Sequence, residues 1–274
     1  MLKRIDNSVL HAQTTRRALC LPMPRNKLAT IDGALVETIA KRLETALNVP
    51  SVTPLYEMIA PQQWLLCFFY GREKYTRVAT YEKGVMGELK YIPQLTISLL
   101  VDKLHNQLYL STNCDEVCYE AAILQTFNGT LFPARTANQG WYAYNFDLNV
   151  LPTITEDVRS PEKSNAAWQD LKLKGLIWRE SGGYVSEVKK EWMPDAFPSL
   201  DQGEFHWPKH VRAATLKFRP NDCAHYFILE MHNNTGYIRL AFTAVKLAAL
   251  SALVSLMAPG ELKLVERVEP TAEK

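Results

Sequence analysis

The segment 205–219 combines positive charge with aromatic rings. Its sequence, FHWPKHVRAATLKFR, holds four Lys and Arg residues, two histidines and three aromatic residues, and it contains no acid. Lys and Arg side chains neutralise backbone phosphates, and aromatic rings stack on nucleotide bases. The segment therefore predicts contact with nucleic acid. The alternative is a strand whose bulky residues pack in the core while its charged residues form a solvated face.

Basic residues also gather elsewhere along the chain. The segment Arg72–Lys90 holds five Lys and Arg residues interleaved with tyrosines, and residues 159–190 hold seven bases against four acids. Residues 191–204, in contrast, hold four acids and no base. Because the formal net charge of the whole chain is only +2, this segregation predicts a basic surface for DNA, RNA or an acidic protein partner. The candidate nucleic-acid contacts are Arg16, Arg17, Arg72, Lys74, Arg77, Lys172, Lys174, Arg179, Lys209, Arg212, Lys217, Arg219 and Trp207.

A different chemistry is suggested by the sequence ESGGYVSEVKK. Glu187 and Lys189 lie two residues apart after a glycine turn, and Asp170 lies seventeen residues before Glu187. This arrangement resembles the acidic-x-Lys pattern of PD-(D/E)xK nucleases. The resemblance implies two carboxylates that hold Mg²⁺ and a lysine that orients the attacking water. A metal-dependent nuclease is therefore the enzymatic alternative to a binding protein.

The same part of the chain allows a second interpretation. The sequence AAWQDLKLKGLIWRESGGYVSEV resembles the last helix and wing of a winged-helix domain over about thirty residues. This resemblance implies that Lys172, Lys174 and Arg179 contact the DNA backbone. A plain helix followed by a hairpin explains the same residues without any DNA contact.

The sequence lacks the common catalytic motifs and has one set of candidate metal ligands. The chain contains no glycine-rich phosphate loop, GxSxG, HExxH or EF-hand sequence, so the usual enzymes built on them are not expected. Five side chains could supply zinc ligands, although Pro208 interrupts the first histidine pair. They are His206, His210, Cys223, His225 and His232. We expect no resident metal or cofactor, with Mg²⁺ as the requirement of the nuclease alternative.

Hydrophobic periodicity outlines the first element. Ile31, Leu35, Ile39 and Leu43 recur every fourth residue, which predicts a helix over 30–48. Runs rich in aromatic and β-branched residues predict strands between 61 and 111, and a helix follows to about residue 127. We then expect a helix from Ser160-Pro161 to about Gly175, followed by a hairpin. The expected strands of the last third are 211–218, 225–231 and 237–242, and an apolar helix spans 244–257.

The order strand–turn–strand–helix occurs twice, about 130 residues apart. The expected fold is therefore α+β, with two small antiparallel sheet-plus-helix units and a wing-like helix–hairpin insert between them. The expected organisation is a basic N-terminal arm at 1–29, an α+β unit at 30–158, the insert at 159–190, an acidic connector at 191–204, and an α+β unit with an apolar C-terminal helix at 205–274.

Composition limits the class of protein. The chain has 274 residues, 47% of them hydrophobic, so neither disorder nor a miniature disulfide fold is expected. No run of eighteen apolar residues without charge occurs, so no membrane contact is expected. The five cysteines form no CxxC pair, which favours reduced thiols and a cytoplasmic location.

These features together favour a function in binding. We expect a non-catalytic nucleic-acid-binding protein, or a subunit of a nucleic-acid-associated complex, which contacts the phosphate backbone through its basic-aromatic segments. A PD-(D/E)xK-type nuclease and a protein–protein scaffold are the alternatives. The apolar helix expected at 244–257 is also compatible with a subunit interface, and therefore with a homo-oligomer.

Overall fold

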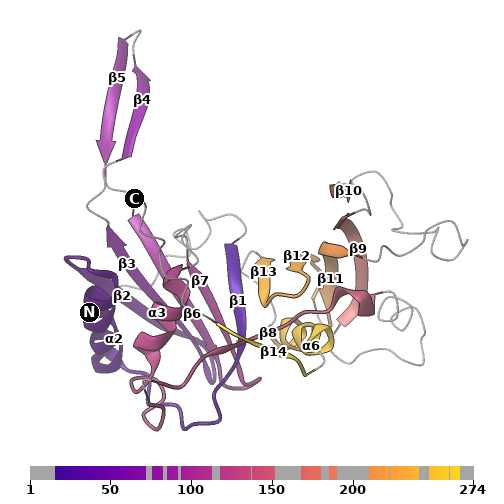
Figure 1. Cartoon of the computed structure of the whole chain (residues 1–274), viewed down its shortest axis with the longest axis horizontal. Helices are drawn as coiled ribbons and strands as arrows, with labels where there is room; N and C mark the ends of the chain where they lie inside the picture. The colour runs from indigo at the N-terminus through magenta and orange to yellow at the C-terminus, as the bar shows by residue number, and fades with distance from the viewer. Residues whose placement is uncertain are drawn as a thin grey trace, which may run out of the picture. The chain divides into compact units, whose positions relative to one another are not determined.

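The computed structural model describes residues 16–71, 76–82, 85–91, 94–112, 118–136, 138–151, 168–179, 185–189, 210–221, 223–240, 247–258 and 260–265. In these residues helices occur together with antiparallel sheets, so the fold is α+β, and strands predominate. The chain forms two compact units (Figure 1). Unit 1 is built on Met23–Trp141, and unit 2 on Asp6–Pro22 together with Tyr142–Lys263.

The sheet of unit 1 is an antiparallel meander whose strands are adjacent in the order of the sequence. Alternate side chains of its central strands, such as Leu66, Phe68 and Leu99, are fully or almost fully buried. The ring of Phe68 lies 6.2 Å from that of Phe127 on the following helix, so this face of the sheet packs against helices. The elements are α2 (Gly33–Leu47), β2 (Val52–Ala60), β3 (Gln63–Gly71), β6 (Gln94–Asp102), β7 (Gln107–Thr112) and α3 (Cys118–Phe127).

Helix α2 confirms the helix predicted over 30–48. The side chain of Asp32 caps its first turn by accepting a hydrogen bond from the backbone N–H of Leu35 at 2.8 Å. Asn48, with φ of 50°, ends it in the left-handed conformation. Ile39 and Leu43 are completely buried, as predicted from the apolar residues at every fourth position.

Strand β2 was not among the strands expected from the sequence, and it contains Pro54 near its beginning. It is the last strand in the order of this sheet, a position at which proline is tolerated. The backbone N–H of Val52 donates instead to the carboxylate of Glu44 at 2.9 Å. Both features limit the pairing of further strands with this part of the edge.

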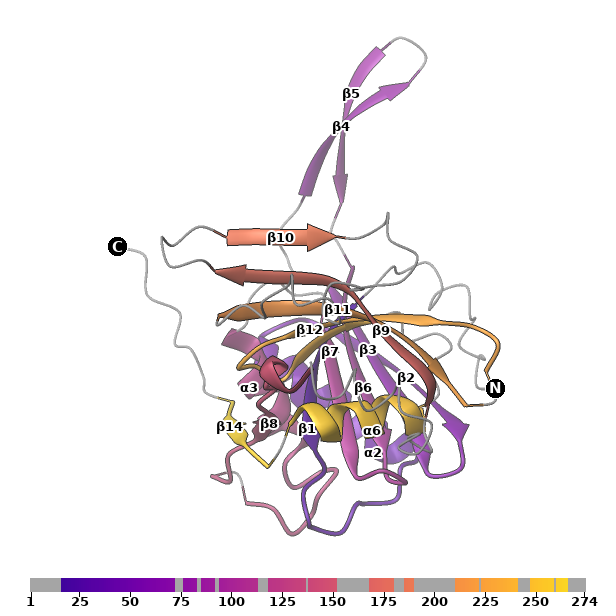
Figure 2. The same cartoon turned by 90° about the vertical axis from the view of Figure 1, so that its right-hand side faces the viewer.

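A long hairpin is inserted between β3 and β6. It consists of β4 (Thr76–Glu82) and β5 (Val85–Tyr91), and in the described part of the chain these strands pair only with each other. Figures 1 and 2 show the hairpin as a separate two-stranded ribbon. Arg77 belongs to β4, opposite Lys90 of β5 in the register.

The sheet of unit 2 has the strand order β10-β9-β11-β12-β13-β1, and every neighbouring pair is antiparallel. Its buried face includes Leu216, Phe218 and Leu229, and α6 contributes Leu250 and Leu253 to the core. The elements are β1 (Arg16–Pro22), β8 (Tyr142–Tyr144), the 3₁₀ turn η1 (Leu148–Val150), β9 (Trp168–Arg179), β10 (Val185–Lys189), β11 (Val211–Pro220), β12 (Phe227–His232), β13 (Tyr237–Leu240), α6 (Leu247–Met257) and β14 (Leu262–Leu264), which pairs with β8.

The expected N-terminal arm is wrong for residues 16–22. They form strand β1, in which Arg16–Leu19 pair with Tyr237–Leu240 of β13. Ala18 and Cys20 are completely buried, so the apolar run ALCL determines this segment more strongly than the surrounding charges. The remainder of the predicted arm before residue 16 lies outside the described residues.

The helix expected up to Gly175 is also wrong where the structure describes it. Residues 168–179 form strand β9, because the alternation Leu171-Lys172-Leu173-Lys174 has the period of a strand. The hairpin itself is confirmed, since Val185–Lys189 pair with Gly175–Arg179. Because a strand replaces the recognition helix, the structure does not support a winged-helix insert. The residues expected to begin the helix and the acidic connector lie outside the described residues.

The repeated order expected from the sequence is present. β6, β7 and α3 follow one another in unit 1, as do β12, β13 and α6 in unit 2. The turn between the two strands contains a left-handed asparagine in each case, Asn106 with φ of 55° and Asn234 with φ of 56°. A glycine of positive φ follows each helix, Gly129 and Gly260. Among the described residues, no helix has the length and apolar character needed to cross a membrane.

Candidate nucleic-acid interface

The outward face of the unit 2 sheet gathers basic residues from several strands. In the register, Arg219 lies opposite Asp170, Thr215 opposite Glu230, and Glu230 opposite Arg239. Arg239 in turn lies opposite Arg17 of β1. Directly opposite residues share a face of a sheet, so these side chains lie on one surface, here called the basic face. Its described members are Arg17, Asp170, Ile177, Thr215, Lys217, Arg219, Tyr226, Ile228, Glu230, His232, Tyr237 and Arg239.

One cluster of the basic face centres on Tyr226. The Lys217 ammonium lies 4.2 Å from the centroid of the Tyr226 ring, and the Arg219 guanidinium carbon lies 5.3 Å from it. The Tyr226 hydroxyl donates to the Asp170 carboxylate at 2.6 Å. The ring is therefore fixed by Asp170 and provides a surface on which two cations are held.

A second cluster centres on Tyr237. The Arg17 guanidinium carbon lies 3.6 Å from the centroid of the Tyr237 ring. Nearby, Nε2 of His232 lies 2.9 Å from a carboxylate oxygen of Glu230. Burial lowers the pKa of His232, and the positive charges of Arg17 and Arg239 lower it further, whereas Glu230 opposes the shift.

The structure therefore brings together several of the predicted contacts. Arg17, Lys217 and Arg219 lie on the basic face, whereas Lys174 is the residue without a register partner at the bulge between β9 and β11 and is not assigned to this face. Arg212 and Arg179 are exposed on the same unit. The sequence interpretation missed Arg239, Tyr226 and Tyr237. The alternation in the segment 237–242 (YIRLAF) could have indicated Arg239 and Tyr237.

The other predicted contacts cannot be assigned to this face. Arg72, Lys74, Trp207 and Lys209 lie outside the described residues. For Arg16, Arg77 and Lys172, the structure describes the backbone alone, and the register places Lys172 opposite Lys217.

The nuclease arrangement is not assembled in this register. Asp170 lies near the beginning of β9, whereas Glu187 of β10 pairs with Ile177. Seven residues of strand separate Asp170 from Ile177, roughly 23 Å. Two carboxylates so far apart cannot share one metal ion. The Asp170 carboxylate instead accepts the hydrogen bond from Tyr226.

The zinc hypothesis also lacks its geometry. Cys223 and His225 precede β12 and do not lie on a strand, contrary to expectation. The residues that the structure describes contain no group of three or more His, Cys, Asp or Glu side chains able to hold a metal ion. His206 lies outside them.

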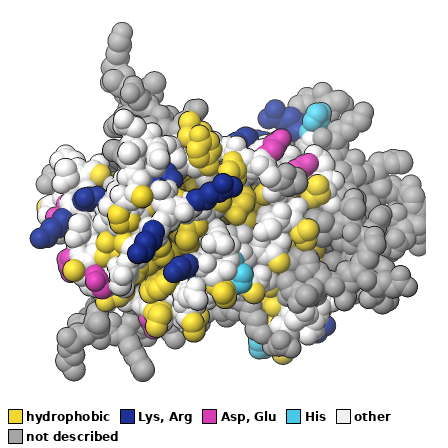
Figure 3. Space-filling model, turned by 90° about the horizontal axis from the view of Figure 1, so that it is seen from below, with side chains coloured by type: hydrophobic (Ala, Val, Ile, Leu, Met, Phe, Trp, Pro, Cys, Tyr) yellow, Lys and Arg dark blue, Asp and Glu magenta, His cyan; other side chains and the backbone are white. Residues whose placement is uncertain are grey.

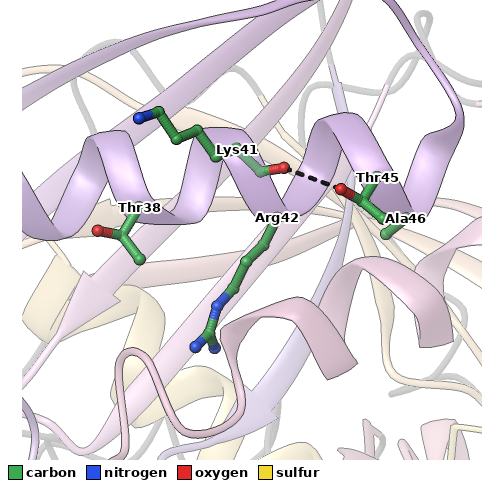
Figure 4. Close-up of a pocket in the computed structure, with 5 residues that line it drawn as sticks. All are labelled: Thr38, Lys41, Arg42, Thr45 and Ala46. Atoms are coloured by element: carbon green, nitrogen blue, oxygen red, sulfur yellow. Dashed lines mark hydrogen bonds between the residues drawn. The ribbon is translucent and has the colours of Figure 1, made fainter.

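Unit 1 offers a different kind of surface, a shallow groove of about 430 Å³ along α2. Figure 4 shows Lys41 and Arg42 pointing in different directions from this helix. Nη1 of Arg42 donates to the carbonyl of Asn128 at 3.3 Å and to the hydroxyl of Thr130. Since its two cations do not converge, the groove is a weaker candidate for binding anions than the basic face.

The comparisons with known proteins give no family. No known protein family matches the chain, and no curated protein is similar to it in sequence. Figure 3 shows a face on which the described Lys and Arg side chains are separated by hydrophobic and uncharged groups. The contacts of the basic face are therefore the observations that bear on function.

Proposed function

We propose that this protein binds nucleic acid through the phosphate backbone and does not cleave it. The observation that carries the proposal is the basic face of unit 2. Its described side chains include four cations and two carboxylates from adjacent strands. The four cations are Arg17, Lys217, Arg219 and Arg239.

The arrangement across the strands supports this proposal. Neighbouring strands of a sheet lie about 4.8 Å apart, so the opposite residues Arg17 and Arg239 place two positive charges close together. Like charges directly opposite one another destabilise a sheet, and Glu230, which lies opposite Arg239 on β12, offsets part of this repulsion. A bound phosphate backbone would relieve this repulsion and would release its own counterions.

The aromatic residues support a different part of the proposal. The rings of Tyr226 and Tyr237 carry cations, at 4.2 Å for Lys217 and 3.6 Å for Arg17. These contacts orient the cations and occupy a side of each ring. We therefore assign the main contribution to phosphate contacts, with base stacking as a minor one.

The test is a gel shift with single- and double-stranded DNA and RNA, carried out with EDTA and with Mg²⁺. The proposal predicts a shifted, intact probe in both conditions. Shortened probe in Mg²⁺ that persists after repeated purification would contradict binding without cleavage. The absence of any shift at 50 mM NaCl would overturn the proposal and favour the protein scaffold.

Matched variants locate the interface. The double variant Arg17→Gln, Arg239→Gln should bind weakly, because it removes two phosphate contacts. The control Lys41→Gln, Lys103→Gln removes two exposed cations of unit 1 and should bind like the wild type. Equal weakening of both variants would show that total charge, and not the basic face, determines binding.

A further inference from the structure

The basic face includes an apolar side chain that the sheet leaves exposed. Ile228 of β12 is 53% exposed, the highest exposed fraction among the large hydrophobic side chains that the structure describes in unit 2. Tyr226 and Glu230, two residues away on the same side of the chain, are polar. Because apolar surface is stabilised when it leaves water, Ile228 would gain from contact with an apolar part of a ligand.

Cations flank this isoleucine on two sides. In the register Ile228 lies directly opposite Lys217 of β11, where Cβ atoms are roughly 4.5–5.5 Å apart. Arg239 of β13 lies opposite Glu230 and is therefore a diagonal neighbour of Ile228, at roughly 7–8 Å. A ligand that contacts both cations consequently covers the isoleucine.

The width of the basic face prevents it from entering a groove of a duplex. The face extends over five neighbouring strands, from Asp170 on β9 to Arg17 on β1. Since neighbouring strands lie about 4.8 Å apart, the face is roughly 19 Å wide. The major groove of B-DNA is about 12 Å wide and the minor groove about 6 Å. A duplex would therefore contact this face through its phosphates, and its stacked bases would not reach Ile228.

The balance of charge favours the same kind of ligand. Glu230 lies opposite Arg239 and offsets part of its charge. Asp170 does the same for Arg219, so the positive charge of the face is moderate. Duplex DNA carries one negative charge per about 1.7 Å of its axis and is bound chiefly through phosphate contacts. A single strand presents fewer charges and uncovered bases, so contacts with bases can supplement a moderate positive charge.

We propose that the basic face binds single-stranded nucleic acid in preference to a duplex, with an unstacked base on Ile228 between phosphates held by Lys217 and Arg239. This inference rests on the proposed function and deepens it, since it specifies the form of the nucleic acid. Phosphate contacts supply most of the affinity, and the base on Ile228 supplies the preference for a single strand. No covalent step is involved.

The test measures the binding of probes of equal length by fluorescence anisotropy at one salt concentration. The probes are a single strand and the corresponding duplex, each as DNA and as RNA, together with a DNA strand that lacks its bases. We expect the tighter-binding single strand, DNA or RNA, to bind about tenfold more tightly than the duplex of the same chemistry. The abasic strand keeps its phosphates and should lose most of this advantage.

Variants of one side chain separate the base contact from the phosphate contacts. Ile228→Thr retains a β-branched residue in the strand and removes apolar surface, so it should weaken single-strand binding about threefold. Binding of the duplex and of the abasic strand should not change. Ile228→Val should retain most of the preference. The control Leu104→Thr replaces a leucine of unit 1 that is 57% exposed and should bind every probe like the wild type.

The outcomes distinguish this inference from the proposed function. Duplex binding as tight as single-strand binding would overturn the inference and leave backbone binding intact, whereas binding of no probe would overturn both. Equal binding of the abasic and complete strands would show that bases contribute nothing. If Ile228→Thr weakens duplex and single strand equally, the isoleucine acts on the sheet and not on a base, and its assignment is wrong.

Discussion

Asn128 provides a direct test of how unit 1 is held together. Its side chain is 5% exposed. Its Oδ1 accepts from Nε of Arg135 at 2.8 Å, and its Nδ2 donates to the carbonyl of Gln139 at 3.2 Å and to the side chain of Gln125. One short amide therefore joins the end of α3 to the loop that follows it.

The substitution Asn128→Ala removes these three hydrogen bonds. Two neutral bonds contribute about 1 kcal/mol each and a bond to a charged group about 1.5–3 kcal/mol. Since Arg135 is half-buried, water can satisfy part of what is lost. We expect the free energy of unfolding to fall by about 2–4 kcal/mol. Asn128→Asp keeps the acceptor for Arg135 and should lose less.

The measurement is urea denaturation monitored by tryptophan fluorescence. The control is Asn26→Ala, which removes an asparagine outside this network and should change the free energy by less than about 0.5 kcal/mol. If Asn128→Ala were as stable as this control, the network would contribute nothing and the reasoning would be refuted.

Three further predictions concern unit 2. Gly236→Ala should lower the free energy of unfolding by about 1–3 kcal/mol, because a Cβ atom there would lie 2.7 Å from the backbone oxygen of Tyr144; unchanged urea denaturation would contradict this packing. Burial raises the pKa of the Cys20 thiol, so mass spectrometry after brief treatment with iodoacetamide should find Cys223 labelled and Cys20 unlabelled; equal labelling would contradict the buried position of β1. Because the pKa of His232 is lowered in the folded protein, the unfolded chain binds its proton more readily, and stability falls as the pH decreases through about 6.5. The melting temperature of His232→Gln relative to the wild type should therefore rise from pH 7.5 to pH 5.5, and a constant difference would contradict the shift.

Local patterns predicted most of the regular elements. Helix α2, the strands β3, β4, β6 and β7, and the sequence β11, β12, β13 and α6 all follow from periodicity and turn residues. The failures have a common cause. The charges around β1 and the Ser160-Pro161 signal before β9 are local features, whereas pairing with β13 and β11 is decided by partners distant in the sequence.

The candidate site was predictable only in part for the same reason. Composition identified Arg17, Lys217 and Arg219 as basic residues, but only the register shows which of them share a face with Arg239. The expected nuclease site is not formed for the same reason. Spacing along the chain does not show that Asp170 lies near one end of β9, whereas Glu187 of β10 pairs near the other end.

The salt dependence of binding tests the central proposal most directly. The slope of log Kobs against log[NaCl] measures how many phosphates are neutralised, at about 0.7 per contact for single strands and about 0.9 for B-DNA. Fluorescence anisotropy between 50 and 200 mM NaCl should give a steep slope for the wild type. In the variant Arg17→Gln, Lys217→Gln, Arg219→Gln, Arg239→Gln the slope should be shallower by about 3. An unchanged slope in this variant would contradict the assignment of nucleic-acid binding to the basic face.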